Sequence, residues 1–266
     1  MSNNMHSFFL LGAIFLLIIA GLRPASAQRV APLIVDMSVY NEKSDGVVTV
    51  DNTSAAPLFI ETELYRRQIH ISGKENLTLV GGGNFVIFPP QAVIAPKSQQ
   101  TFRLTWANQP LDATQSYHMR VRSLPLPGNQ VLTQTSQDDV RSLDTRLSNA
   151  QIGVDVFVAV HASPKDATVD LHIKDIRVTN LDQTTDITFL TLNRGRRYAS
   201  LKNASLFLKD KSGKQIAEIN GAELLAHNPS TLIPANGERR FNLILPRIYS
   251  SEIATVAIHC CERNTQ

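Results

Sequence analysis

Cysteine is nearly absent from this chain of 266 residues, and its two cysteines are adjacent, at Cys260 and Cys261. Neighbouring residues can be joined only through a strained ring, so this pair is a poor structural crosslink. A buried thiol, a vicinal disulfide and an intermolecular bridge all remain open. With only His259 beside them, the two thiols fall short of the three or four ligands of a zinc site.

The chain also lacks an excess of charge of either sign. It has 26 basic and 23 acidic residues, which gives a formal net charge of +3. Arginines occur in the short clusters Arg66-Arg67, Arg194 to Arg197 and Arg239-Arg240, which lie far apart in the sequence and which we interpret as solvated faces. Nucleic-acid binding requires concentrated Lys and Arg, so we expect no nucleic-acid partner.

Motifs for catalysis are missing as well. No H-x-H or H-E-x-x-H spacing, G-x-S-x-G elbow or phosphate-binding loop is present. The seven histidines are scattered: His6, His70, His118, His161, His172, His227 and His259. We therefore expect no catalytic residues, no metal, no cofactor and no enzymatic activity. Because a β-sandwich can gather ligands from distant strands, a metal titration would test this expectation.

The longest hydrophobic run, Phe8 to Leu22, has 15 residues, whereas a membrane-spanning helix needs roughly 20. Small residues follow at Ala25 and Ala27, where a signal peptidase would read them. We expect residues 1–27 to be a signal peptide cleaved after Ala27, with no membrane insertion of the mature chain. The usual Lys or Arg before the run is missing, so a membrane anchor is the alternative.

Beyond residue 27 the hydrophobic pattern has a period of two, which predicts β-strands. In the first half, the expected strands are Val47–Val50, Leu58–Tyr65, Thr101–Trp106, His118–Leu124 and Ile152–Val160. In the second half, they are Val169–Val178, Ile187–Leu192, Ala204–Leu208, Gln215–Ile219, Arg239–Leu245 and Ile253–His259. With Gly- and Pro-rich turns between them, these strands predict an all-β protein of two related sandwiches. The expected domains are residues 28–163 and 164–266, with a linker at His161–Asp166.

A long polar connection, residues 125–149, precedes the sharpest alternation in the chain. Loops of this length are usually functional or mobile. The following segment, Ile152 to Val160, places branched apolar residues at five successive even positions.

The order of these features resembles the periplasmic pilus chaperones of the chaperone-usher pathway, the PapD-like family. The segments that carry the resemblance are NFVIFPPQAVIAPKSQQTFRL (84–104), YHMRVRSLPLP (117–127) and IGVDVFVAVHASP (152–164). The second domain matches weakly, through LIPANGERRFNLILP (232–246). The family has a disulfide in this domain, and only one cysteine of the Cys260-Cys261 pair can correspond to it. The sequence departs from the best-known branch of the family and looks more like its divergent, archaic type.

The resemblance implies a periplasmic chaperone, built as a boomerang of two immunoglobulin-like domains, that binds pilin subunits and delivers them to an outer-membrane usher. It implies capture by a donated strand, with Ile152, Val154, Val156 and Val158 as the donated side chains. The alternative is that these residues form the core of an ordinary central strand.

The family's basic anchor for the subunit's terminal carboxylate has no match at its usual positions, which fall at Asp36–Val39 and near Ala159. A buried carboxylate still needs charge-assisted donors, so Arg120 and Arg122 are the expected replacements. A plain solvated face is the alternative for both arginines.

A different class of function is also compatible with this fold: an exported structural or adhesin-like immunoglobulin module. Such a protein would carry a polymerisation strand at its mature N-terminus and would assemble with itself. Residues 28–40 show only weak alternation, which argues against it.

Overall fold

The computed structural model describes residues 28–40, 43–81, 83, 85–107, 110–124, 153–181, 183–246 and 253–260. The predicted signal peptide and the long polar connection lie outside these residues. Among the residues described, no helix is long and apolar enough to cross a membrane.

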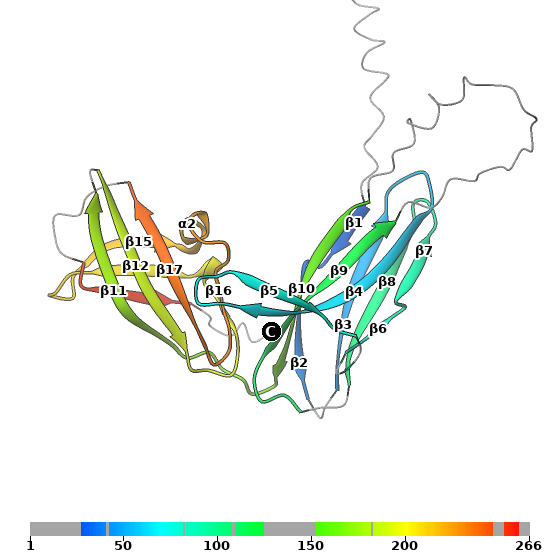
Figure 1. The fold of residues 1–266 in the computed structure, drawn as a ribbon, viewed down its shortest axis with the longest axis horizontal. Coiled ribbons are helices and arrows are strands. Elements are labelled where there is room, and N and C mark those ends of the chain that lie inside the picture. Colours follow the sequence, from blue (N-terminus) through cyan, green and yellow to red (C-terminus); the bar gives the residue numbers. More distant parts are fainter. Residues whose placement is uncertain are drawn as a thin grey trace, which may run out of the picture.

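The first domain is a sandwich of two sheets (Figure 1). One sheet has the strand order β1-β3-β8-β6, and the other has the order β2-β10-β9-β4-β5 with β7 paired to β4. The bounds are β1 Gln28–Ala31, β2 Ile34–Val39, β3 Lys43–Asn52, β4 Leu58–Ile69, β5 Glu75–Leu79, β6 Phe85–Phe88, β7 Gln91–Ile94, β8 Gln99–Ala107, β9 Gln115–Leu124 and β10 Asp155–Pro164. Strands β1 and β2 follow one another in sequence but belong to opposite sheets, and β2 runs parallel to β10.

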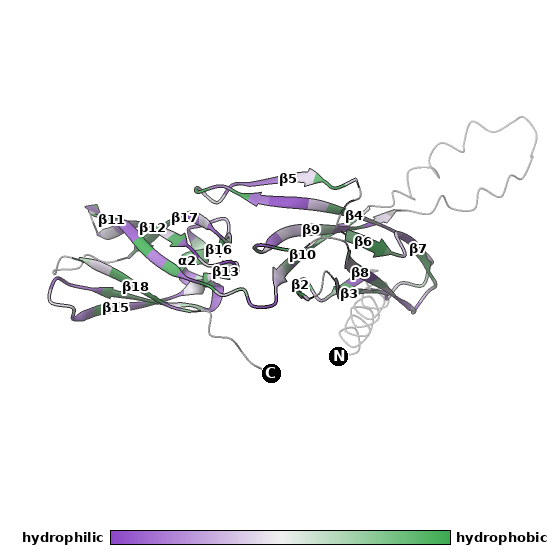
Figure 2. Cartoon of the chain, turned by 90° about the horizontal axis from the view of Figure 1, so that it is seen from below, coloured by the Kyte–Doolittle hydropathy of each residue, from purple (hydrophilic) through white to green (hydrophobic). Residues whose placement is uncertain are grey.

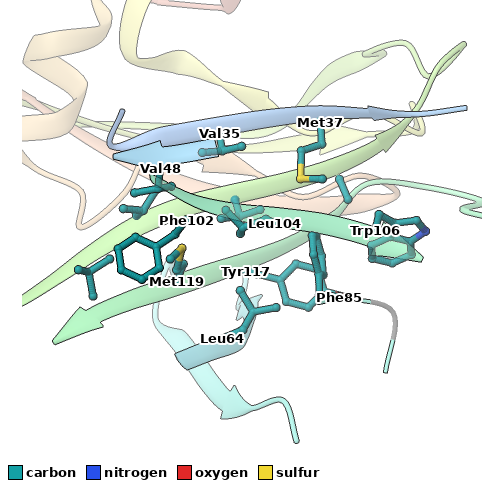
Figure 3. Packing of buried hydrophobic residues seen from close by; sticks show 14 of the residues in the cluster. Val35, Met37, Val48, Leu64, Phe85, Phe102, Leu104, Trp106, Tyr117 and Met119 are labelled. Carbon is teal, nitrogen blue, oxygen red and sulfur yellow. The ribbon is translucent and has the colours of Figure 1, made fainter. Parts of the chain in front are cut away.

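The core of this domain follows from the alternation of side chains along its strands. Strand β8 buries Phe102, Leu104 and Trp106 completely, while the residues between them are more exposed. Figure 3 shows these side chains beside Tyr117 and Met119, which β9 contributes from the facing sheet. The two sheets therefore share one continuous hydrophobic core.

The second domain is a smaller sandwich. Its sheets are β11-β12-β17 and β15-β14-β18, with a short additional pair, β13-β16. The bounds are β11 Leu171–Leu181, β12 Thr184–Asn193, β13 Ala199–Ser200, η1 Leu201–Asn203, β14 Ser205–Lys209, β15 Gln215–Asn220, α2 Gly221–Ala226, β16 Leu232–Ile233, β17 Gly237–Leu245 and β18 Thr255–His259. The two sandwiches meet at an angle (Figure 1), so the prediction of an all-β, two-domain fold is confirmed.

The predicted linker at His161–Asp166 was wrong in its first four residues. These residues continue β10 as far as Pro164 and are buried. His161 and Ser163 tolerate burial because their polar atoms have partners: His161 Nδ1 lies 2.9 Å from Ser116 Oγ, and Ser163 Oγ lies 2.8 Å from Thr114 Oγ1. Pro164 sits at the strand's end, where a missing N–H is tolerated.

One contact between the domains is made by the long β4–β5 hairpin, which reaches from the first domain to β17 (Figure 2). At its tip, the carbonyl of Ile71 accepts hydrogen bonds from the Arg240 N–H (2.7 Å) and from Arg239 Nη1 (3.2 Å). Strand β17 is one of the two edge strands of its sheet in the described chain, so the hairpin tip covers part of that edge. We call this contact the hairpin clasp.

Arg239 is the centre of the hairpin clasp. The sequence suggested a solvated side chain here, but Arg239 is fully buried, which corrects that interpretation. Its Nε and Nη2 donate to the carbonyls of Leu232 (3.1 Å) and Ser230 (2.6 Å), and its guanidinium lies over the ring of Phe241. Gly73 in the hairpin turn has φ of 89°, and a Cβ there would collide with this guanidinium.

A second contact between the domains lies at the end of β10. The His161 ring stacks on Tyr198 of the second domain, with ring centroids 3.9 Å apart. The Tyr198 hydroxyl donates to Asp36 on β2 at 2.7 Å, and the Thr114 N–H donates to the Arg196 carbonyl at 2.8 Å. Among the described residues, this second contact is separate from the hairpin clasp.

The second core also includes residues of the last described segment, residues 253–260. Cys260 packs against this core and is disulfide-bonded, so the interpretation of a free buried thiol was wrong for this residue. The other cysteine, Cys261, lies outside the described residues.

Candidate functional site

Strand β10 has two neighbours along only part of its length. Strand β9 pairs with it from Asp155 to Ala162, but β2 pairs with it only from Ala159 to Pro164. On the side of β2, no strand in the described part of the chain pairs with β10 before Ala159. This N-terminal stretch, Asp155–Val158, is the open edge of β10.

The hydrogen-bond pattern shows which backbone groups face the open edge. The Ala159 N–H donates to Leu33, next to β2, at 2.9 Å, whereas the Val154 carbonyl accepts from Ser123 on β9 at 3.0 Å. Backbone groups in a strand alternate in direction. The N–H and C=O groups of Asp155 and Phe157 therefore point away from β9 and toward the open edge.

The four residues predicted as donated side chains lie at different depths. Val158 is fully buried in the core of its own domain, and Val156 is partly buried against that core. Val154, just before the strand, is 46% exposed. Ile152 lies outside the described residues. The apolar face of this segment thus emerges from the core toward its N-terminal end.

The two predicted anchor residues lie side by side on the other, outward face of the same sheet. The register places Arg120 of β9 opposite Phe157, and Arg122 opposite Asp155, both on β10. Arg120 is paired with Glu63 of β4 and lies 3.7 Å from Asp155, while Arg122 Nε lies 3.2 Å from Asp155 Oδ1. Both arginines are therefore already paired with carboxylates of their own chain.

Arg120 is the more confined of the two arginines. Its side chain is 16% exposed, against 39% for Arg122, and its guanidinium lies 5.4 Å from the centre of the Tyr65 ring. Its Nε is buried and has no hydrogen-bond partner among the described residues. A buried donor without a partner is costly, so Arg120 retains a capacity to bind another acceptor.

The charge network continues along the sheet to Glu75. Arg67 Nε donates to the Glu75 carboxylate at 2.8 Å, and His118 Nε2 lies 3.4 Å from it. Burial alone would raise the pKa of Glu75, but the hydrogen bonds from His118 and Arg67 outweigh burial and lower the pKa to about 2. Glu75 thus stays ionised above that pH.

Sequence reasoning missed a cavity of about 340 Å³ between the domains. Its walls come from the end of β4, the start of β9, β16 and the loop between β16 and β17: Arg66, Arg67, Gln68, Ile69, His70, Thr114, Gln115, Ser116, Leu232, Pro234 and Ala235. Arg67, interpreted from sequence as solvated, has a side chain that is only 9% exposed, so that interpretation was wrong for Arg67. The residues of this cavity are distant in sequence, and no local motif marks it.

Groups of three or more His, Cys, Asp or Glu that could hold a metal ion do not occur within the described ranges.

Residues 35–148 match the family model described as pili and flagellar-assembly chaperone, PapD N-terminal domain. The match covers 114 of the 266 residues, and this part of the chain is similar to the N-terminal domain of PapD-type pilus chaperones. This finding agrees with the resemblance that the segments around residues 84–127 indicated.

Solved structures with the same two-domain fold include a class 5 fimbriae chaperone, CfaA, at a TM-score of 0.56 and 11% identity, covering 90% of this chain and 94% of that one. Another is the chaperone in the CsuC–CsuE complex, a chaperone with a tip adhesion subunit from the archaic Csu pili of Acinetobacter baumannii, at a TM-score of 0.51 and 14% identity. It covers 87% of this chain and 91% of that one. No curated protein sequence matches the chain. At these identities the likenesses show the fold, and the archaic subtype stays a prediction.

Proposed function

We propose that this protein is a PapD-type chaperone, exported to the periplasm, that captures pilin subunits by donating β10 and delivers them to an outer-membrane usher. The observation that carries the proposal is the open edge of β10, where the backbone groups of Asp155 and Phe157 have no neighbouring strand in the described chain. An unpaired edge is a template for another strand, and pairing of this kind binds through the main chain.

Side chains would add specificity to this backbone pairing. In the proposed complex, Val154 and Val156, which lie where the apolar face emerges from the core, enter the partner's hydrophobic groove together with Ile152. Val158 has a different role in this proposal. Because it is fully buried in the chaperone's own core, it holds the donated segment in place at the rim of the sandwich.

Arg120 and Arg122 are the proposed anchor for the subunit's terminal carboxylate. They lie on neighbouring rows of β9, beside the donated segment, and together they already hold the carboxylate of Asp155. Guanidinium groups bind carboxylates through charge-assisted hydrogen bonds, which are stronger than neutral ones. The unpaired Nε of Arg120 offers one more donor for that purpose.

The test is a double substitution, Val154→Ser with Val156→Ser, in the full chain co-expressed with each pilin subunit encoded in the same genome. Each pocket side chain contributes roughly 1.5 to 3 kcal/mol by burial, so losing two should weaken capture by several orders of magnitude. Co-purification of subunit with chaperone from the periplasm measures capture. Recovery of subunit at the wild-type level by the double variant would contradict strand donation by this segment.

A fold control separates capture from stability. Val158→Ala removes methyl groups from a fully buried site and should lower the free energy of unfolding by about 2 kcal/mol. The double serine variant should lose less stability, because Val154 is 46% exposed and Val156 only partly buried. Polymers of this chain alone, instead of complexes with pilin, would favour the adhesin-like alternative.

A further inference from the structure

Asp155 occupies the space between the two arginines proposed as the anchor. Its Oδ1 lies 3.2 Å from Arg122 Nε and its Oδ2 lies 3.7 Å from Arg120 Nη1, so one carboxylate bridges both guanidinium groups. The strand register explains this position. Asp155 lies directly opposite Arg122, and it is two residues before Phe157, which lies opposite Arg120. The arrangement is that of a carboxylate-binding site that the chain fills with its own side chain.

The charges at this site are balanced without any partner. Arg120 and Arg122 supply two positive charges, and Glu63 and Asp155 supply two negative ones. An added carboxylate would leave a negative excess and would be repelled by the carboxylates already in place. Binding of a terminal carboxylate therefore requires one of the resident acids to leave.

Asp155 is the resident acid that is held more weakly. Glu63 pairs closely with Arg120 and also accepts a hydrogen bond of 2.7 Å from the Tyr65 hydroxyl. In the described part of the chain, the Asp155 carboxylate contacts only the two arginines, and its side chain is 34% exposed. It can thus turn into solvent at little cost in desolvation.

We infer that Asp155 is a place-holder that occupies the arginine pair in the empty chaperone and is displaced by the terminal α-carboxylate of a bound polypeptide. The inference rests on the proposed function and adds a competing residue to it. Asp155 begins the strand whose open edge pairs with the subunit. Strand donation and carboxylate exchange therefore take place on the same segment, and the exchange conserves the charge of the site.

The experiment compares Asp155→Asn with the wild-type full chain. The probe is a synthetic peptide of the last strand of the pilin recovered by co-purification, made with a free terminal carboxylate and as the terminal amide. Removing the competitor should tighten binding of the carboxylate form by about five- to tenfold, since exposed or half-exposed ion pairs are worth about 1 kcal/mol. The amide form should show no such gain.

Two further variants control for other effects. Asp155→Glu retains a competing carboxylate and should bind more like the wild type than like Asp155→Asn. Asp45→Asn removes a comparable pair, 3.7 Å from Arg103 on the other sheet, and should leave both dissociation constants unchanged.

The outcomes separate the place-holder from the function on which it rests. Equal dissociation constants for Asp155→Asn and wild type, or a gain shared by the amide, would overturn the place-holder. If the double serine variant still loses capture in that case, the proposed function stands. A wild-type chain that binds neither a subunit nor either peptide overturns both.

Discussion

His161 is a buried imidazole between the domains, where it stacks on Tyr198. Burial, helped by the positive charges of Arg67, His118 and Arg197, lowers the pKa of His161 to about 3. The imidazole is therefore neutral at physiological pH. Burial and the hydrogen bond to Asp36 raise the pKa of Tyr198, so both stacked rings are uncharged there.

This burial predicts a pH dependence of stability. Below pH 6.5 the unfolded chain protonates His161, but the folded chain does not until about pH 3, so the unfolded state binds more protons in this window. Stability should fall as pH drops from 6.5, with His161 contributing at most about 1.4 kcal/mol per pH unit. Urea unfolding between pH 4.5 and 6.5 measures how the free energy of unfolding changes with pH. This range lies above the window in which protonation of Glu75 contributes.

The control for this prediction is His161→Gln, which keeps a polar side chain but removes the titrating group. Its stability should depend less on pH in the same window. An identical slope in both proteins would show that His161 is not the group responsible.

At the scale of the element, the two sides of β10 differ in how much folding stability a proline substitution should remove. The N–H of Phe157 faces the open edge, whereas the N–H of Val156 faces β9. Phe157→Pro removes a donor that has no strand partner in the described chain, so its folded state should lose less stability than that of Val156→Pro. Thermal unfolding of the two free proteins measures the difference.

The same pair of variants tests pairing with a partner strand. Phe157→Pro should abolish subunit co-purification even though the free protein folds, because the partner loses a main-chain donor at the centre of the open edge. Normal capture by this variant would mean that the partner strand does not pair with this edge. If Phe157→Pro proves the less stable variant, our assignment of the open side is incorrect.

Much of the strand content was predictable because side chains alternate between core and solvent along strands such as β8 and β12. Strand β2 was missed, although Val35, Met37 and Val39 alternate into the core, since the alternation is short and the apolar Ile34 on the exposed face interrupts it. The sequence also predicted that Arg120 and Arg122 lie on one face of the same strand. Their partners were not predictable, because Glu63 and Asp155 reach them through strand pairings across 57 and 33 positions.

At the scale of the whole molecule, the hairpin clasp couples the domains through a buried charge. The guanidinium of Arg239 is satisfied by backbone carbonyls of both domains, Ile71 in one and Leu232 and Ser230 in the other. A local pattern cannot reveal such a contact, because Arg239 and Ile71 are 168 positions apart. The cavity between the domains could not be predicted for the same reason, because the segments that line it are far apart in the sequence.

The hairpin clasp predicts the effect of Gly73→Ala. The added Cβ would collide with the Arg239 guanidinium at a positive φ of 89°, so the hairpin tip should lift from β17. We expect a loss of about 1 to 3 kcal/mol in unfolding free energy and a wider range of interdomain distances. Chemical denaturation and spin-label distance measurements between the domains test these two effects. Gly213→Ala, at a positive φ in an open turn, is the control for backbone strain alone.

The parallel pairing of β2 with β10 also has a consequence for the proposed export. It joins residues 34–39 to residues 159–164, so the strands of this sheet that come first and last in the sequence are neighbours. Pairings between residues this far apart form slowly, because a long loop must close first. A chain that emerges from a translocation pore N-terminus first cannot complete this sheet until residue 164 is outside. Until β10 emerges, residues 115–122 of β9 lack their β10 neighbour, and the domain is at its most vulnerable to aggregation and proteolysis.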